Sequence, residues 1–205
     1  MNSRNHLLAL AFAGLLLAQG CAGLSVSQDV VYGRNALQSG RSNEAVGYLT
    51  RAAAQDPNYT LTSPFSEGVL TILGRAYYES GRDAEARATL EKALARDKED
   101  HLARLYLGLT LVRTGERERG AQEIQSGLRG VYDRLEYIAA DSYSGTFWDP
   151  NRILRNDIKA TLAQKTDSPE VIVSAHQIGT LVDREIDLAR RDEINQRYNR
   201  NVDNN

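Results

Sequence analysis

A stretch of twenty residues recurs three times in this chain. Residues 33–52 read GRNALQSGRSNEAVGYLTRA, residues 74–93 read GRAYYESGRDAEARATLEKA, and residues 108–127 read GLTLVRTGERERGAQEIQSG. The second and third copies begin 34 residues apart, and the first and second begin 41 apart, which is the same period with an insertion of seven. A fixed period of this length is typical of a solenoid built from stacked repeats. The repeat therefore constrains the fold more than any other feature of the sequence.

Small residues fall in register across the three copies, and they predict how each unit folds. The aligned glycines are Gly33, Gly74 and Gly108 at the first position and Gly40, Gly81 and Gly115 at the eighth. Two helices can cross closely only where no side chain separates their backbones, which suits the first set. The second set falls where the first helix must end, because glycine adopts the left-handed capping conformation at the least cost. Each copy is thus expected to form two helices about a turn, and the copies stack to share one core.

The spacing of small, aromatic and bulky residues resembles the tetratricopeptide repeat (TPR) family over roughly residues 26–134. The resemblance implies an all-α fold, a TPR helix-turn-helix solenoid with C-terminal capping helices. We assign residues 29–134 to three TPR repeats, residues 135–190 to a helical C-terminal extension, and residues 191–205 to a polar, disordered tail. No stretch of the chain carries a strand signal.

Helix boundaries after the first repeat follow from proline and from apolar spacing. Ser-Pro or Asp-Pro pairs at 63–64, 149–150 and 168–169 predict helix starts, since proline suits the first helical position. An apolar stripe extends the second helix of the third repeat to about Ala140, and a second stripe occupies residues 172–189.

The role of the C-terminal extension stays open at the level of sequence. It either seals the end of the solenoid or folds back across the concave face. The helix expected over 99–114 favours the second role, because it is apolar nearly all round and such a helix should be buried. The stripe over 172–189 is either an intramolecular cap or the seam of a dimer.

The N-terminus is expected to be a targeting segment. A short polar start carrying Arg4 precedes the apolar run LLALAFAGLLLA over residues 7–18. A run of this length is too short to span a bilayer and is typical of a secretion signal.

The end of this run and the residues after it, Leu-Ala-Gln-Gly-Cys over 17–21, resemble the lipobox of bacterial lipoproteins. The resemblance implies a lipoprotein signal peptide over 1–20, an acylated Cys21 and a tether over 21–28. Ala22, in place of Asp, implies sorting to the outer membrane, where the lipid anchor holds the protein on the periplasmic face. The alternative is a plain signal peptide followed by a chance cysteine.

In the TPR family, positions on the first helix of each repeat line a concave groove that binds protein partners. The resemblance carries this role to Arg34, Gln38, Arg75, Tyr78, Glu79 and Arg113. Arg34 and Arg75 hold the same position in adjacent repeats, so we expect them side by side, where two guanidinium groups suit an acidic segment. The alternative is that both are solvated or paired with Glu79. If they form such a site, reversing both to Glu should abolish capture of the partner without changing stability by more than about 1 kcal/mol, the usual range for surface changes.

The sequence carries no pattern typical of catalysis, of a cofactor or of a metal site. His101 and His176 have no second histidine or cysteine at ligand spacing. Phosphate loops and dinucleotide fingerprints are absent from the sequence. The net charge of −2 argues against nucleic acid as a partner. We therefore expect no enzyme activity, no cofactor and no metal.

Phe147 and Trp148 lie on a connection just before a predicted helix. They either form an exposed aromatic anchor for a partner, or pack under the loop and fix the start of that helix, with Asp149 as its N-cap.

These observations favour a membrane-anchored periplasmic TPR adaptor that binds protein partners, including an acidic segment. Family analogy suggests an assembly factor for a secretion, pilus or polymer-export machine of the envelope. The alternative is a structural lipoprotein whose C-terminal helices dimerise or occlude the groove, which then has no ligand.

Overall fold

The structure is a computed structural model that describes residues 26–61, 64–141, 143–165 and 167–203. The signal peptide, Cys21 and Ser63 lie outside these residues. A helix over residues 26–38, called the N-terminal helix below, comes first. The helices that follow are α2 (Ser42–Gln55), α3 (Val69–Glu79), α4 (Asp83–Arg96), α5 (His101–Arg113), α6 (Arg117–Ala140), α7 (Ile153–Leu162) and α8 (Pro169–Asp203). The short elements are the strands β1 (Thr60–Leu61) and β2 (Glu67–Gly68) and the 3-10 helix η1 (Ser144–Thr146).

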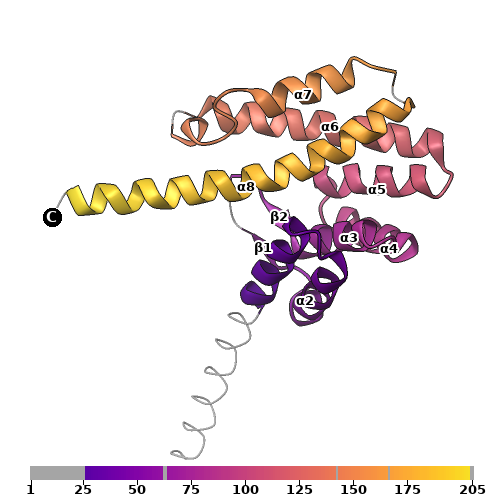
Figure 1. The fold of residues 1–205 in the computed structure, drawn as a ribbon, viewed down its shortest axis with the longest axis horizontal. Helices are drawn as coiled ribbons and strands as arrows, with labels where there is room; N and C mark the ends of the chain where they lie inside the picture. The colour runs from indigo at the N-terminus through magenta and orange to yellow at the C-terminus, as the bar shows by residue number, and fades with distance from the viewer. Residues whose placement is uncertain (1–25, 62–63, 142, 166, 204–205) are drawn as a thin grey trace, which may run out of the picture.

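The predicted all-α fold is confirmed, and the helices stack in the order of the chain. The N-terminal helix with α2, α3 with α4, and α5 with α6 form three helix pairs, each packed on the next. Figure 1 shows the first pair at one end of the stack and α6 and α7 at the other. From α7, helix α8 runs back across α5 toward the N-terminal helix. The last helix therefore connects the two ends of the solenoid.

The aligned glycines lie where the two helices of each pair cross. A Cβ on Gly33 would lie 2.5 Å from Leu49 Cγ, and one on Gly74 would lie 2.5 Å from Leu90 Cγ. At Gly108, the added atom would lie 2.6 Å from the backbone nitrogen of Ile124. No real Cβ fits at such distances, so the crossing depends on glycine at these positions.

The second set of glycines ends the first helix of each pair. Gly40, Gly81 and Gly115 have φ angles of 71°, 74° and 99°, the left-handed region that other residues rarely adopt. The amide that follows each glycine bonds back into the last turn, as Arg41 N does to Ala36 O at 2.8 Å. This is the Schellman geometry, which satisfies carbonyls that the helix end leaves free.

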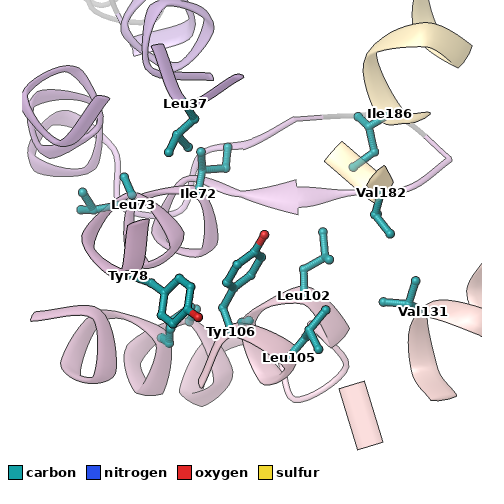
Figure 2. Close-up of a cluster of buried hydrophobic side chains, with 14 of the residues drawn as sticks. Leu37, Ile72, Leu73, Tyr78, Leu102, Leu105, Tyr106, Val131, Val182 and Ile186 are labelled. Atoms are coloured by element: carbon teal, nitrogen blue, oxygen red, sulfur yellow. The ribbon is translucent and has the colours of Figure 1, made fainter. Parts of the chain in front are cut away.

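One core runs through the repeats and into α8. Figure 2 shows Leu37, Ile72 and Leu102 converging with Val182 and Ile186 of α8. Helix α5 is buried on almost every side, as its uniformly apolar sequence predicted, because α8 covers the side that the neighbouring repeats leave open.

The start of the second repeat differs from the prediction. Helix α3 begins at Val69 rather than near Pro64, and the preceding residues form a two-stranded antiparallel hairpin that pairs Thr60 with Gly68. The extended backbone buries both Leu61 and Phe65. The sequence also indicated no strand, so both predictions for this segment were wrong: β1 and β2 pair through their backbones, a contact that the apolar pattern does not reveal.

The helix after η1 also begins later than predicted, at Ile153 rather than Pro150. Asp149 still caps it, because its two carboxylate oxygens accept from Leu154 N and Arg155 N, each at 3.0 Å. The intervening turn passes through Arg152, which has a φ of 58°.

Both ends of the described chain are more helical than the sequence indicated. Residues 26–28, assigned to a tether, belong to the N-terminal helix, and Val26 is buried. At the other end, the tail predicted to be disordered continues α8 as far as Asp203. That segment contains neither proline nor glycine, so a helix already docked on the core propagates through it at low cost. None of the helices in the described residues is long and apolar enough to cross a membrane.

Gly74→Ala should lower the free energy of unfolding by about 1–3 kcal/mol, because the new methyl overlaps Leu90 and one helix must move. Urea unfolding followed by circular dichroism measures the change. Gly47→Ala is the matched control, since no atom lies within 4 Å of its Cβ position in α2. This second substitution should raise the free energy of unfolding by about 0.5–1 kcal/mol. Effects of the same sign and size at both sites would contradict the close crossing.

Candidate functional site: the concave face and α8

The two arginines predicted to line the groove do lie side by side, and one carboxylate lies between them. Arg34 Nη2 is 2.9 Å from Asp183 Oδ1, and Arg75 Nη1 is 3.0 Å from Asp183 Oδ2. Asp183 belongs to α8, 149 residues beyond Arg34 in the chain. The carboxylate beside these arginines therefore comes from the same chain, whereas the prediction was an acidic segment of a separate partner.

Further groups complete this cluster. Arg34 also pairs with Glu67 of β2, and its Nη2 lies 2.9 Å from Asp187 Oδ1, one helical turn beyond Asp183. Gln38 donates to Asp183 Oδ2 at 3.2 Å and also to Asp187. We call these six residues the arginine cluster: Arg34, Gln38, Glu67, Arg75, Asp183 and Asp187.

Burial of the arginine cluster overturns two expectations from the sequence. Arg34 and Arg75 are 3% and 4% exposed, so they are neither solvated nor paired with Glu79. The expectation that both could be reversed to Glu at little cost is wrong for the same reason, since a buried carboxylate facing Asp183 would be unpaired.

The remaining predicted groove residues form the rim of the same face. Glu79 Oε1 lies 2.9 Å from His176 Nε2 of α8. Arg113 has its guanidinium 3.7 Å from the centre of the Tyr78 ring and bonds Asp83 through Nε at 2.7 Å. Arg113 thus joins α5 to its neighbours in α3 and α4.

Helix α8 approaches the repeats closely because it carries a glycine. A Cβ on Gly179 would lie 2.7 Å from the hydroxyl oxygen of Tyr106. That hydroxyl and Arg75 Nε are both buried without a hydrogen-bond partner among the described residues. The apolar positions of α8 that face the repeats, all buried, are Val171, Ala175, Ile178, Val182, Ile186 and Ala189.

Little of the groove remains open. A cleft of about 220 Å³ lies beside the arginine cluster, between Gln38, Glu79 and His176. Ligand pockets usually measure about 300–1,000 Å³. The cleft is thus smaller than a typical small-molecule site and far too small for a peptide helix.

The charges of the arginine cluster do not balance when every group is ionised, because three carboxylates face two guanidinium groups. Burial alone would raise the pKa of Asp183, but Arg75 and Arg34 outweigh burial and hold that pKa below its usual value. Glu67 has a weaker set of partners. Burial raises the pKa of Glu67 to about 7, with Arg34 lowering it and Asp183 raising it further. Below about pH 7, a proton on Glu67 relieves the excess negative charge.

The aromatic pair on the connection before α7 is not an exposed anchor, so that prediction was wrong. Trp148 is 0% exposed and stacks on Phe65 with ring centres 6.3 Å apart. Its Nε1 donates to Glu193 Oε1 of α8 at 3.3 Å. Phe147 is partly buried and meets Tyr143 edge to face. The alternative is confirmed for the rings, which pack under the loop. Asp149 accepts from amides in the first turn of α7, although the N-cap position itself is Arg152.

No group of three or more His, Cys, Asp or Glu side chains in the described residues is placed to hold a metal ion. His101 and His176 lie apart, in α5 and α8.

Comparison with known proteins supports the reading of the repeats. Residues 36–106 match the family model described as Tetratricopeptide repeat. The match spans most of the first two helix pairs and ends within α5, and the third pair repeats the same glycine geometry beyond it. No curated protein matches the chain.

Asp183→Ala should lower the free energy of unfolding by about 3–5 kcal/mol, because it leaves Arg75 buried without a carboxylate partner. Asp187→Ala should cost less, since Asp187 is partly exposed and Arg34 keeps two other partners. Glu44→Ala is a surface control that breaks an exposed ion pair with Arg41 and should change stability by less than about 1 kcal/mol. Equal losses in the Asp183 and Glu44 variants, measured by urea unfolding, would show that the cluster is not structural.

Stability should fall as pH rises through the range set by Glu67. Its pKa is raised from 4.5 to about 7 in the folded protein, so between these values the folded state binds more protons than the unfolded state. The free energy of unfolding then decreases with rising pH, by an amount on the order of 3 kcal/mol. Glu67→Gln keeps the shape of the side chain and removes its titration. The difference in stability between wild type and this variant should therefore depend on pH between 4.5 and 7. A constant difference across that range would contradict a proton on Glu67.

Proposed function

Because this is a tetratricopeptide repeat protein, we propose that it is a lipid-anchored scaffold on the periplasmic face of a bacterial outer membrane that binds protein partners outside its concave groove. TPR proteins are typically non-catalytic scaffolds for protein-protein interaction. The observation that carries the proposal is the carboxylate of Asp183, held between Arg34 and Arg75. It fills the place where a partner's acidic segment would bind.

Displacement of α8 by a partner is unfavourable on three grounds. The arginine cluster is buried, and both guanidinium groups pair there with Asp183 of α8. Removing α8 would break these ion pairs and leave Asp183 without its partners. The apolar side chains of α8 from Val171 to Ala189 belong to the common core. Helix α8 is also part of the same chain, so its effective concentration at the groove is far above that of a separate partner. We therefore propose that α8 occludes the groove permanently.

The end of α8 is the surface that we propose for partner binding. Ala189 is the last residue of α8 in the core and Glu193 still bonds Trp148, but Figure 1 shows the end of the helix extending past the body of the repeats. Ile194 and Tyr198 are largely exposed there, four residues apart on one side of the helix. Apolar side chains at this spacing are the anchors that a helix presents to a groove on another protein.

The lipid anchor at Cys21 rests on the lipobox-like sequence that precedes it. A more specific role, assembly of a secretion, pilus or polymer-export machine, rests on family analogy alone.

Cross-linking of the acylated protein in cell envelopes, followed by capture, tests the proposal. Wild type should capture a partner, and the double variant Ile194→Glu/Tyr198→Glu should lose most of it. Tyr137→Glu is the matched control, since Tyr137 is an equally exposed tyrosine on α6 and its loss should leave capture unchanged.

A further variant tests the groove. Gly179→Leu forces α8 away from Tyr106 and opens the concave face without altering a charge. A new partner captured only by this variant would show that the groove has a ligand, which would contradict permanent occlusion. A cross-linked product of two copies of the chain, lost in the double variant, would instead support the structural dimer.

A further inference from the structure

The outer side of the N-terminal helix differs in composition from the other exposed surfaces of the repeats. Its exposed side chains are Gln28, Val31, Tyr32 and Asn35, none of which carries a charge. For comparison, the exposed side of α4 carries Glu91, Lys92 and Arg96. The end of a solenoid normally needs a polar outer face or a capping helix. The exposed side chains of the N-terminal helix are uncharged, and no capping helix covers them in the described residues, whereas α7 and α8 cover the last repeat.

Apolar and aromatic groups gather on this outer side. Val31 and Tyr32 are each 46% exposed. Tyr32 packs on Tyr48 of α2 with ring centres 5.5 Å apart, and the guanidinium of Arg51 lies 4.9 Å from the centre of the Tyr48 ring. We call Val31, Tyr32 and Tyr48 the outer aromatic face.

The outer aromatic face is electrostatically neutral at its edges. Asp29 pairs with Arg51 at 2.7 Å, and Glu44 pairs with Arg41 at 2.7 Å. It therefore has no net charge that would repel an anionic surface or require a cationic one. Tyrosine is enriched where proteins meet the headgroup region of a bilayer, because its ring is apolar and its hydroxyl remains hydrated.

The position of the face along the chain determines what it can reach. Five residue steps separate Cys21 from Val26, which limits their Cα atoms to about 17 Å apart. Val31 follows five residues later in a helix, or about 7.5 Å farther along its axis. If Cys21 is acylated, the first repeat is the part of the solenoid closest to the bilayer.

We propose that the outer aromatic face docks on the headgroup region of the bilayer and orients the solenoid on the membrane. The inference rests on the proposed lipid anchor at Cys21. The acyl chains supply the affinity, and the face sets the orientation, with the first repeat against the lipid and the end of α8 available to partners.

Fluorescence quenching in vesicles tests the docking directly. The acylated full-length protein carrying Val31→Cys is labelled with an environment-sensitive dye and reconstituted into vesicles of phosphatidylcholine and phosphatidylglycerol. A fraction of the lipids carries a nitroxide quencher on the headgroup. Val173→Cys is the matched control, because Val173 is a 57% exposed valine on α8. Quenching at residue 31 should be several-fold stronger than at residue 173.

A second variant separates the face from the anchor. Tyr32→Glu, added to Val31→Cys, should reduce the quenching several-fold while the protein still floats with the vesicles. Tyr137→Glu in the same background should leave the quenching unchanged. Equal quenching at residues 31 and 173, or no effect of Tyr32→Glu, would overturn the docking while the protein remains anchored.

The parent protein without an added cysteine reports on the anchor itself. If Cys21 is acylated, the parent takes up no thiol dye and floats with the vesicles, because Cys21 is the only cysteine in the chain. A parent that labels at Cys21 and fails to float would overturn the lipid anchor, and with it both proposals.

Discussion

The carboxylate of Asp183 lies between two buried arginines of adjacent repeats, Arg34 and Arg75, and pairs with both. Neither Arg34 nor Arg75 could be enclosed without a counter-ion, since the desolvation of an unpaired guanidinium is costly. Helix α8 supplies that counter-ion, and the repeats in turn supply the only charged partners that Asp183 has among the described residues. The inner wall of the repeats and the last helix therefore depend on each other for stability.

The repeat architecture could be read from the sequence because its determinants are local. The glycine at each helix crossing and the glycine at each turn lie seven residues apart. The close crossing and the left-handed turn that require them both lie within a single repeat. The sequence of α5 also predicted a contact between distant parts of the chain, since its uniformly apolar surface indicated that another element must cover it. The sequence indicated that the extension after the third repeat covers α5, but it did not indicate which residues of the extension make the contact.

The chemistry of the site was predictable, but the source of its acidic groups was not. Two arginines at equivalent repeat positions indicated a carboxylate ligand, and carboxylates are there. Asp183 and Asp187 are, however, ordinary polar positions on an amphipathic helix, and nothing in their neighbourhood distinguishes them from solvated residues. Glu67 was missed for a related reason, because its partner Arg34 is distant from it in sequence. For Trp148 the sequence left exposure and burial open, since its contact with Glu193 is also distant in sequence.

Contacts between Arg34 and Asp183 also change the way in which the protein unfolds. In an open solenoid each repeat contacts only its neighbours, so the ends can unravel while the middle stays folded. Here the last helix packs on the first repeat, and 149 residues separate the paired side chains. Opening either end breaks contacts at both. The chain is thus closed into a single cooperative unit. Because contacts between residues distant in sequence slow folding, it should fold more slowly than a solenoid that has only local contacts.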